Sequence, residues 1–383
     1  MALDSLFTLP SEYEDLRASV HSLAEKEIAP FAHDVDEDAR FPQEAFNALQ
    51  RAGLAAAHVP TEFGGEGADA LAVVLIVEEV ARACASSSLI PAVNKLGSLP
   101  LIFSGSDEQK ERWLRPLAQG KGFSYCLSES SAGSDAAAVR TRAKKSGDSW
   151  ILNGSKKWIS NAGFSDFYTV MAATDPAAGA KGITAFVVEK SDPGVSFGAH
   201  EKKMGFRGSP TREVNFDNVE LPDDRRISEV GEGFALAMRT LDHTRITIAA
   251  QALGIAQGAL DVAAKYAQER EQFGKPIFDF QGIQFMLADM AMQIAASRQL
   301  TYAAAAKSER DDADLRFYAA ACKCFASDTA MKVTTDAVQI LGGYGYVSDY
   351  PVERMMRDAK LTQIYEGTNQ VQRILMARNL PKI

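Results

Sequence analysis

The chain has 383 residues, of which 46% are hydrophobic and 24% are charged, a balance that is ordinary for a soluble globular protein. Its 50 acidic residues outnumber its 41 lysines and arginines and give a net charge of −9. Because a nucleic-acid-binding protein usually carries a basic footprint, this charge disfavours that class of function. The length is sufficient for two or three domains.

Cysteine usage and apolar patterning bear on the compartment. The four cysteines form no C-x-x-C pair, and Cys322 and Cys324 would point to different faces of a helix, so we expect neither a metal site nor a disulfide. The first residues lack the basic start and apolar core of a signal peptide. No stretch approaches the ~18 uninterrupted apolar residues that suggest a membrane span. We therefore expect a cytoplasmic protein without a membrane segment.

Residues 1–121 are expected to form a helical domain. Ser11 and Glu14 have the spacing of a capping box, which predicts the start of a long helix that reaches about Val35. Pro42 marks the start of a second helix, because proline is favoured at the first helical position.

The rest of this domain is predicted from turn residues and apolar runs. A patch rich in glycine and proline at 60–67 predicts a break. Apolar helices are predicted over 70–85 and 90–103. Ser106 and Gln109 again have capping-box spacing and predict one more helix.

A β domain is expected over 122–228. Runs rich in β-branched and aromatic residues predict strands at 167–172, 183–188 and 212–216. Asn153-Gly154 lies between two strand-like segments and predicts a two-residue hairpin turn.

Residues 229–383 are predicted to be helical again, with apolar side chains at helical spacing. The matching triplets are Phe234, Met238 and Leu241, and Leu287, Met290 and Ile294. Three or four long helices joined by short loops indicate a bundle. The whole chain is thus predicted to be an α+β multidomain protein.

The stretch 363–373, Q-I-Y-E-G-T-N-Q-V-Q-R, is the main candidate for chemistry. Glu366 is its only carboxylate and lies between Tyr365 and Gly367. A carboxylate among apolar neighbours loses hydration, which raises its pKa toward neutrality and suits a general base for a weakly acidic C–H. Gly367 would allow a close approach to Glu366, and Thr368 could cap the following helix. On its own, the pattern is more typical of a solvated surface glutamate.

Residues 339–379 as a whole closely resemble the C-terminal signature of the acyl-CoA dehydrogenases, flavoenzymes that introduce a double bond next to a thioester. The matching text is Q-I-L-G-G-Y-G-Y, then Y-P-V-E-R-M-M-R-D-A-K, then the stretch around Glu366. The resemblance implies an N-terminal α-helical domain, a central β domain and a C-terminal four-helix bundle. It also implies FAD, an acyl-CoA substrate, an electron-transfer flavoprotein as partner and a homotetramer.

Tyr125 to Asp135, Y-C-L-S-E-S-S-A-G-S-D, is rich in small and hydroxyl residues, so its backbone could approach a planar ligand. From the residues alone, a polar loop is the simpler interpretation. The segment resembles the family's flavin-binding E-P-G-x-G-S-D, with Ser130-Ser131 in place of Pro-Gly. The resemblance assigns cofactor contacts to Tyr125, Leu127, Ser128 and Ser134, and places Ser134 near the CoA portion.

Lys157 to Gly163, K-W-I-S-N-A-G, offers an indole face for stacking at Trp158. Ser160 is expected on the same face of a strand, two residues further on. A core tryptophan beside a surface serine is the alternative. The segment resembles the family's W-I-T/S motif, in which the hydroxyl bonds flavin N5, and this implies cofactor roles for Trp158, Ile159 and Ser160.

Arg270 to Pro276, R-E-Q-F-G-K-P, begins with a forked cation suited to a pyrophosphate, although an arginine at a helix C-terminus is commonplace. It resembles the family's site for the FAD of a neighbouring subunit. The implied cofactor contacts are Arg270, Gln272, Phe273, Gln281, Gln339, Ile340, Gly342 and Gly343, together with Thr368 and Gln370.

Leu241 to Arg245, L-D-H-T-R, places an arginine on an apolar helix, where an unpaired charge would be costly. A structural ion pair is one interpretation. The segment also resembles the family's D-x-T-R region near the substrate. The implied substrate contacts are Ser134, Asp242, Arg245, Tyr365 and Gly367. Some relatives carry their base at position 244, and Thr244 here leaves Glu366 as the base.

The resemblance predicts that Glu366 removes the α-proton of a short or short-branched acyl-CoA while the β-hydrogen leaves as hydride to the flavin. Two alternatives keep the fold. One is a flavin oxidase or monooxygenase that uses dioxygen. The other is a non-enzymatic DNA-associated relative, which the acidic chain disfavours.

Overall fold

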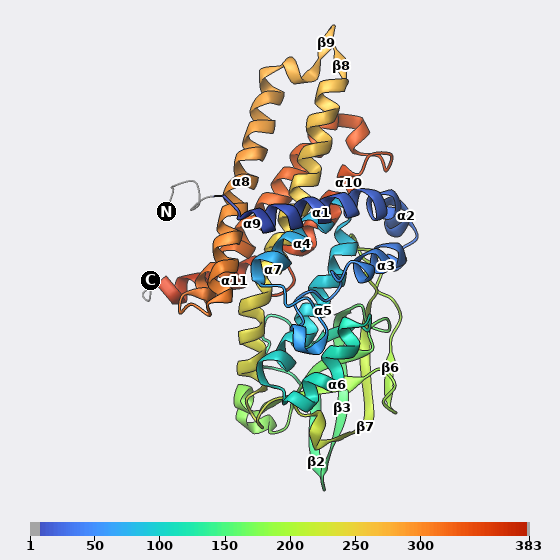
Figure 1. Ribbon diagram of the computed structural model, residues 1–383, viewed down its shortest axis with the longest axis vertical. Coiled ribbons are helices and arrows are strands. Elements are labelled where there is room, and N and C mark those ends of the chain that lie inside the picture. The colour runs from blue at the N-terminus through green and yellow to red at the C-terminus, as the bar shows by residue number, and fades with distance from the viewer. Residues whose placement is uncertain (1–7, 381–383) are drawn as a thin grey trace.

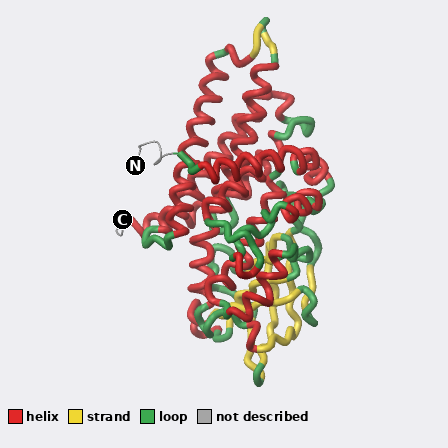
Figure 2. Tube along the Cα trace, in the orientation of Figure 1, coloured by secondary structure: helices red, strands yellow, loops and turns green. Residues whose placement is uncertain are grey.

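The computed structural model of the protein describes residues 8–380. The molecule is elongated, with a sheet at one end and long helices that extend to the other (Figure 1). Strands are confined to the lower end of the view except for a short hairpin at the upper tip (Figure 2). The predicted succession of helical, β and helical regions is therefore confirmed.

Within the described residues, six α-helices precede the sheet. They are α1 (Ser11–Glu27), α2 (Ala32–Glu37), α3 (Gln43–Arg51), α4 (Ala70–Ala83), α5 (Ala85–Ser104) and α6 (Asp107–Ala118). Helix α3 begins directly after Pro42, as predicted. The capping box of α6 is also confirmed, because the Ser106 side chain accepts from Gln109 N–H while the Gln109 side chain accepts from Ser106 N–H.

The first helix starts at Ser11, as predicted, but its predicted cap and its predicted end are wrong. Ser11 is already helical and Pro10 occupies the N-cap position, so no side chain caps the helix. The helix ends at Glu27 instead of near Val35, because Pro30 lacks an N–H and a short 3₁₀ turn over Ala29–Phe31 follows. Helix α5 also begins earlier than predicted, at Ala85, after a single extended residue at Cys84.

The sheet has seven strands, and β4 is paired with β1, β2 and β5. Beyond β2 the order continues through β3 and β7 to β6. The strands are β1 (Phe123–Cys126), β2 (Arg142–Ser146), β3 (Ser149–Ser160), β4 (Phe167–Ala173), β5 (Ile183–Glu189), β6 (Val195–Phe197) and β7 (Thr211–Pro222). Both β4 and β5 are almost wholly buried, which matches their continuous apolar runs.

The hairpin predicted at Asn153-Gly154 is wrong. Strand β3 runs straight through both residues, and its pairing with β7 shifts register there. Gly154 has φ +142°, and a Cβ on it would lie 2.7 Å from Thr141 Cα, so glycine serves a close approach between chains. The reversal occurs at Gly147-Asp148, between the paired residues Ser146 and Ser149.

Helices return after the sheet. They are α7 (Gly233–Glu269), α8 (Gln281–Glu309), α9 (Leu315–Leu341), α10 (Val352–Thr362) and α11 (Asn369–Asn379), with the hairpin β8 (Glu271–Gln272) and β9 (Lys275–Pro276) between α7 and α8. Helices α7, α8, α9 and α10 pack on one another as a bundle, against which α4 also lies. Helix α7 is long and apolar enough to cross a membrane, but 78% of its most apolar window is buried inside the protein. It is thus the core helix of the bundle.

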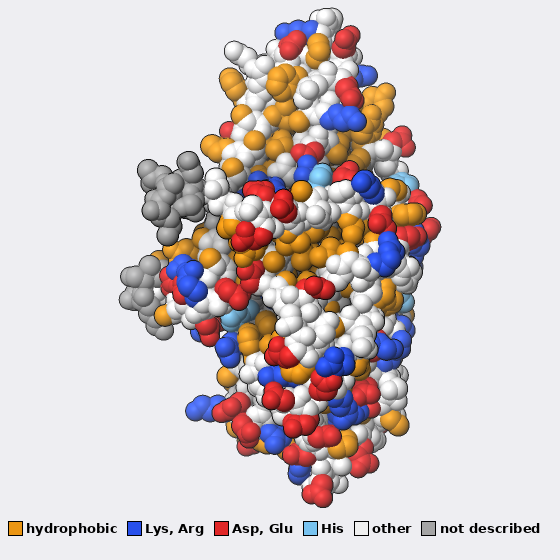
Figure 3. Space-filling model, viewed as in Figure 1, with side chains coloured by type: hydrophobic (Ala, Val, Ile, Leu, Met, Phe, Trp, Pro, Cys, Tyr) orange, Lys and Arg blue, Asp and Glu red, His pale blue; other side chains and the backbone are white. Residues whose placement is uncertain are grey.

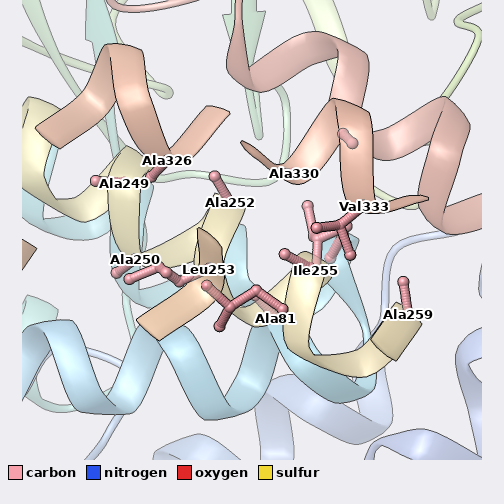
Figure 4. Packing of buried hydrophobic residues seen from close by; sticks show 14 of the residues in the cluster. Ala81, Ala249, Ala250, Ala252, Leu253, Ile255, Ala259, Ala326, Ala330 and Val333 are labelled. Atoms are coloured by element: carbon pink, nitrogen blue, oxygen red, sulfur yellow. The ribbon is translucent and has the colours of Figure 1, made fainter. Parts of the chain in front are cut away.

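The bundle core is built from small side chains. Alanines of α4, α7 and α9 face one another, with a few larger residues between them (Figure 4). The residues labelled there are Ala81, Ala249, Ala250, Ala252, Leu253, Ile255, Ala259, Ala326, Ala330 and Val333. Small side chains let the helix axes approach closely. This packing fixes α7 and α9 against each other.

Two serines with the same sequence spacing allow a test of the capping assignments. We expect Ser106→Ala to lower the free energy of unfolding by about 1 kcal/mol, because the α6 cap is lost. Ser11→Ala is the matched control, since Ser11 is also exposed and followed by Glu14 but caps nothing. Denaturant unfolding of both variants measures the difference. Equal losses would contradict the assignment.

Candidate active site

Glu366 lies in the turn between α10 and α11, with φ +52°. This left-handed conformation costs a non-glycine residue roughly 1–2 kcal/mol and must be held by its surroundings. Gly367 follows with φ +93°, and a Cβ on it would lie 2.7 Å from Gln372 Nε2. Gly367 therefore permits the close approach of the Gln372 side chain, whereas the predicted approach to Glu366 stays a prediction. Thr368 caps α11 through Val371 N–H, also as predicted.

Two buried side chains hold this turn. Gln372 Nε2 donates to the carbonyl oxygens of Glu366 and Gly367, at 3.1 and 2.9 Å. Lys323 Nζ, fully buried on α9, donates to Gly367 O at 2.8 Å and to Asn369 Oδ1 at 2.9 Å. Neither Lys323 nor Gln372 was predicted from the sequence. Lys323 could have been found, because a lysine in the apolar run around Cys322 and Cys324 needs a partner.

The Glu366 carboxyl group is enclosed by protein although part of the side chain remains accessible. Burial raises its pKa to about 7, against the opposing effects of a hydrogen bond from Thr244 and the charges of Arg245, Lys323 and Lys95. Thr244 Oγ1 donates to Glu366 Oε2 at 2.7 Å. The direction of the shift is the one predicted from the apolar neighbours. At neutral pH the group can therefore both take up and release a proton.

The residues predicted to contact substrate around α7 are largely paired with one another. Arg245 Nη1 donates to Asp242 Oδ1 at 2.5 Å, and Arg316 Nε donates to Asp242 Oδ2 at 2.8 Å. Arg245 Nε also reaches Glu366 O at 3.4 Å. Both carboxylate oxygens of Asp242 are thus occupied. Arg245 therefore forms the structural ion pair that was one of its two interpretations, and its bond to Glu366 O ties α7 to the turn. Its contact with substrate stays a prediction.

A second chain of hydrogen bonds leads away from this turn. The Tyr365 hydroxyl donates to Gln251 Oε1 on α7, and Gln251 Nε2 donates to Ser88 Oγ on α5 at 2.8 Å. Gln251 and Ser88 are fully or almost fully buried. The Glu366 turn is therefore connected through Gln251 to α5 of the N-terminal domain.

The loop after β1 is shaped by a buried ion pair that the sequence analysis missed. Lys156 Nζ donates to Glu129 Oε1 at 2.7 Å and to Leu127 O at 3.0 Å. Glu129 and Ala132 exchange backbone hydrogen bonds, so Ser130-Ser131 form the tip of a tight turn. The replacement of Pro-Gly by two serines leaves a defined loop. Tyr125 and Leu127 are buried in the core below it.

The predicted cofactor residues of the β domain present polar atoms without protein partners. No hydroxyl of Ser128, Ser134 or Ser160 donates or accepts a hydrogen bond within residues 8–380, and the buried Tyr125 hydroxyl is also unpaired there. The Trp158 side chain is 58% exposed. A broad aromatic face beside unpaired donors suits a planar polar ligand.

The backbone of this segment is irregular. Trp158 has φ +64°, and the pairing of β3 with β7 shifts between Lys156 and Ile159. Burial nevertheless alternates beyond this irregularity, with Trp158 exposed, Ile159 buried and Ser160 half-buried, so the expectation that Trp158 and Ser160 share a face stays a prediction. Ile159 is buried in the core of the β domain, so its side chain is directed away from the exposed Trp158 face.

The predicted cofactor residues of the hairpin region lie far from Trp158 (Figure 1). Arg270, Gln272 and Phe273 belong to the hairpin region at the opposite end of the long axis (Figure 1). Arg270 stacks over Tyr344, 5.4 Å from the ring centroid, and so joins the turn that holds Gly342 and Gly343. The nearby residues Gln281, Gln339 and Ile340 end or begin the adjoining helices, whereas Gln370 is exposed on α11 near Glu366. Within one chain, the two sets do not meet.

Comparison with known proteins agrees with this arrangement. Three family models match the chain in order: the acyl-CoA dehydrogenase N-terminal domain at residues 10–121, the middle domain at 124–219 and the C-terminal domain at 231–380. A probable acyl-CoA dehydrogenase of Mycobacterium leprae, fadE25, is 62% identical over 99% of this chain and 97% of its own length.

More distant relatives show the same coverage. The cyclohex-1-ene-1-carbonyl-CoA dehydrogenase of Syntrophus aciditrophicus is 45% identical over 98% of this chain and 92% of its own length. The structure of butyryl-CoA dehydrogenase from Megasphaera elsdenii matches with a TM-score of 0.95 and 44% identity, over 98% of this chain and 99% of that one. The chain therefore belongs to the acyl-CoA dehydrogenase family of FAD-dependent oxidoreductases.

Proposed function

We propose that this protein introduces the α,β double bond into a short or short-branched acyl-CoA thioester, with Glu366 as the catalytic base. The observation that supports this most is the enclosed Glu366 carboxyl group with a pKa of about 7. Thr244 occupies Oε2, and Oε1 has no partner within the described residues. One oxygen is thus fixed while the other is free to accept a proton from the carbon next to the thioester.

The turn also offers a donor for the thioester carbonyl. The Glu366 backbone N–H makes no hydrogen bond in the described part of the chain. A hydrogen bond from this N–H to the carbonyl oxygen stabilises the charge that develops there when the α-proton is removed. The same residue then supplies both the base and an oxyanion donor. Water displaced by the bound thioester strengthens both interactions.

The β-domain residues fit FAD, because the exposed Trp158 face lies in the same domain as the unpaired hydroxyls of Tyr125, Ser128 and Ser160. When bound, FAD supplies the oxidising power by accepting the β-hydrogen as hydride. Ser134 completes this set by resemblance and is exposed. The hairpin residues Arg270, Gln272 and Phe273 would hold the FAD of a neighbouring copy.

Because the predicted FAD contacts come from the β domain of one copy and the hairpin of another, the protein would have to self-associate, and we propose a homotetramer. Hydrophobic side chains gather on the surface over α8 and the hairpin, whereas charged groups dominate the β domain (Figure 3). The exposed residues include Phe273, Phe278, Phe285, Met292, Tyr344 and Tyr346. A patch of this kind on a globular protein typically marks a protein contact.

The proposal also includes an electron-transfer flavoprotein as the electron acceptor and the cytoplasm as the cellular compartment. A chain in the structure described as the electron transferring flavoprotein of Acidaminococcus fermentans matches with a TM-score of 0.96 and 46% identity. This supports electron transfer from the reduced flavin to such a partner. All four cysteines are free and buried, which suits the reducing cytoplasm.

The oxidase alternative keeps some support. The prolyl acyl carrier protein oxidase AnaB matches with a TM-score of 0.92 at 28% identity. Hydrogen peroxide formation without an added acceptor distinguishes the two activities. Rapid peroxide formation, together with slow transfer to an electron-transfer flavoprotein, would favour the oxidase.

The base assignment is tested with Glu366→Gln. We expect the variant to keep its FAD but to show no bleaching of the flavin when butyryl-CoA is added anaerobically, because the amide cannot accept the α-proton. The measurement is the visible absorbance of the flavin before and after substrate. Bleaching at the wild-type rate would remove Glu366 from this role.

The role of Thr244 is tested by pH. For the wild type, kcat/KM is expected to rise with pH around about 7, as Glu366 loses its proton. Thr244→Val removes a hydrogen bond that favours the carboxylate, so the midpoint should move upward by about one pH unit. Thr247→Val is the matched control, since the Thr247 hydroxyl, on the same helix, is buried without a partner. The same midpoint in wild type and Thr244→Val would contradict the assignment.

A further inference from the structure

Lys95 on α5 is a buried cation without a protein partner. The residue is 7% exposed, yet its ammonium makes no hydrogen bond or ion pair within residues 8–380 and is affected only by burial and by more distant charges. Unlike the Tyr125 hydroxyl, the ammonium is not among the unpaired atoms that are sealed from solvent. It therefore borders a small accessible space. A lysine in this state is costly unless something else binds it.

The position of Lys95 on α5 relates it to the Glu366 turn. Ser88, Ala92 and Lys95 are spaced i, i+4 and i+7, so they share one face of the helix. Ser88 is joined to Tyr365 through Gln251. Lys95 lies two turns further along the same face, about 10 Å along the helix axis. Between them, Ala92 contributes only a methyl group.

The charges near Lys95 are already engaged elsewhere. Asp69 accepts from the Tyr13 hydroxyl and from Ala72 N–H, and Glu309 accepts from Ala70 N–H. Burial lowers the pKa of Lys95 to about 8, although the charges of Glu309, Asp69 and Glu366 oppose this. The ammonium thus stays largely charged at neutral pH but loses hydration without gaining a hydrogen bond.

Two histidines near Lys95 do not satisfy it either. His58 Nε2 is 2.7 Å from Ser98 Oγ, and His243 Nδ1 is 2.7 Å from Ser308 Oγ. Burial lowers the pKa of both imidazoles, and the Lys95 charge lowers each further. Both are therefore neutral at neutral pH and have their own partners. Three ammonium protons remain available to a ligand.

We propose that Lys95 binds an oxygen atom at the far end of the acyl group, so that the preferred substrate is an acyl-CoA whose tail carries a hydrogen-bond acceptor. The inference rests on the proposed function, since it places the reacting carbons at Glu366 and the acyl tail toward Lys95, whose charge acts on that of Glu366. A plain alkyl tail would leave the ammonium unpaired, whereas a keto, hydroxyl or carboxylate oxygen would satisfy it. Sites built around such a hydrogen bond reject analogues that lack the oxygen.

The test compares three thioesters of similar length: hexanoyl-CoA, the same chain with a ketone at its far end, and adipoyl-CoA, which ends in a carboxylate. The readout is kcat/KM with an artificial electron acceptor. In the wild type, we expect at least one oxygenated analogue to exceed hexanoyl-CoA by about tenfold or more. The ketone and the carboxylate arms distinguish a neutral from an anionic tail. Lys95→Met should abolish the preference while hexanoyl-CoA is still oxidised, and Lys95→Arg should retain part of it.

Lys203→Met is the matched control. Lys203 is also partly buried with a pKa lowered to about 8, but its ammonium donates to Ser209 O at 2.8 Å. This variant should keep the wild-type preference. If the wild-type enzyme has the same kcat/KM for hexanoyl-CoA and for both oxygenated analogues, the proposed role of Lys95 is overturned without any variant. An unchanged preference in Lys95→Met would also overturn it. Failure of all three thioesters and butyryl-CoA to bleach the flavin would instead overturn the proposed function.

Discussion

The hydrogen bonds from Lys323 and Gln372 to the carbonyl oxygens of the 366–367 turn are the constraint on which the site depends. A left-handed glutamate is unfavourable by itself and persists only where neighbouring groups fix it. These two side chains come from α9 and α11, and Arg245 adds a contact from α7. The close, alanine-rich packing of α7 on α9 therefore sets where the Glu366 carboxylate lies. The enclosure that raises its pKa is a product of the same packing.

Much of the fold could be predicted from local pattern. Continuous apolar runs identified β4 and β5, and helical spacing identified α7 and α8. The errors have local or tertiary causes. Pro30 ends α1 where the apolar pattern continues. Asn153-Gly154 has the composition of a turn, but its glycine is needed because Thr141 passes close to it. The composition of this pair cannot show which of the two requirements applies.

The candidate site was predictable only in part, for a similar reason. Glu366, Trp158 and Ser160 lie in short motifs that can be identified without a structure. Their supporting groups lie elsewhere in the chain. Lys323 and Thr244 each come from a helix distant in sequence, and Lys156 acts on a loop that precedes it by many residues. Asp242 and Arg245 were predicted to contact substrate; in the structure Asp242 pairs with Arg245 on the same helix and with Arg316 on α9, partners that their motif does not reveal.

The two groups of predicted cofactor residues, at opposite ends of the long axis, have a genetic consequence under the proposed assembly. A chain altered at Trp158 keeps an intact hairpin, and a chain altered at Arg270 keeps an intact β domain. In a mixed oligomer, the intact β domain of one chain can face the intact hairpin of the other, and together they form one complete FAD pocket. Two inactive alleles can thus complement each other when they are expressed together, whereas either allele alone gives an inactive enzyme.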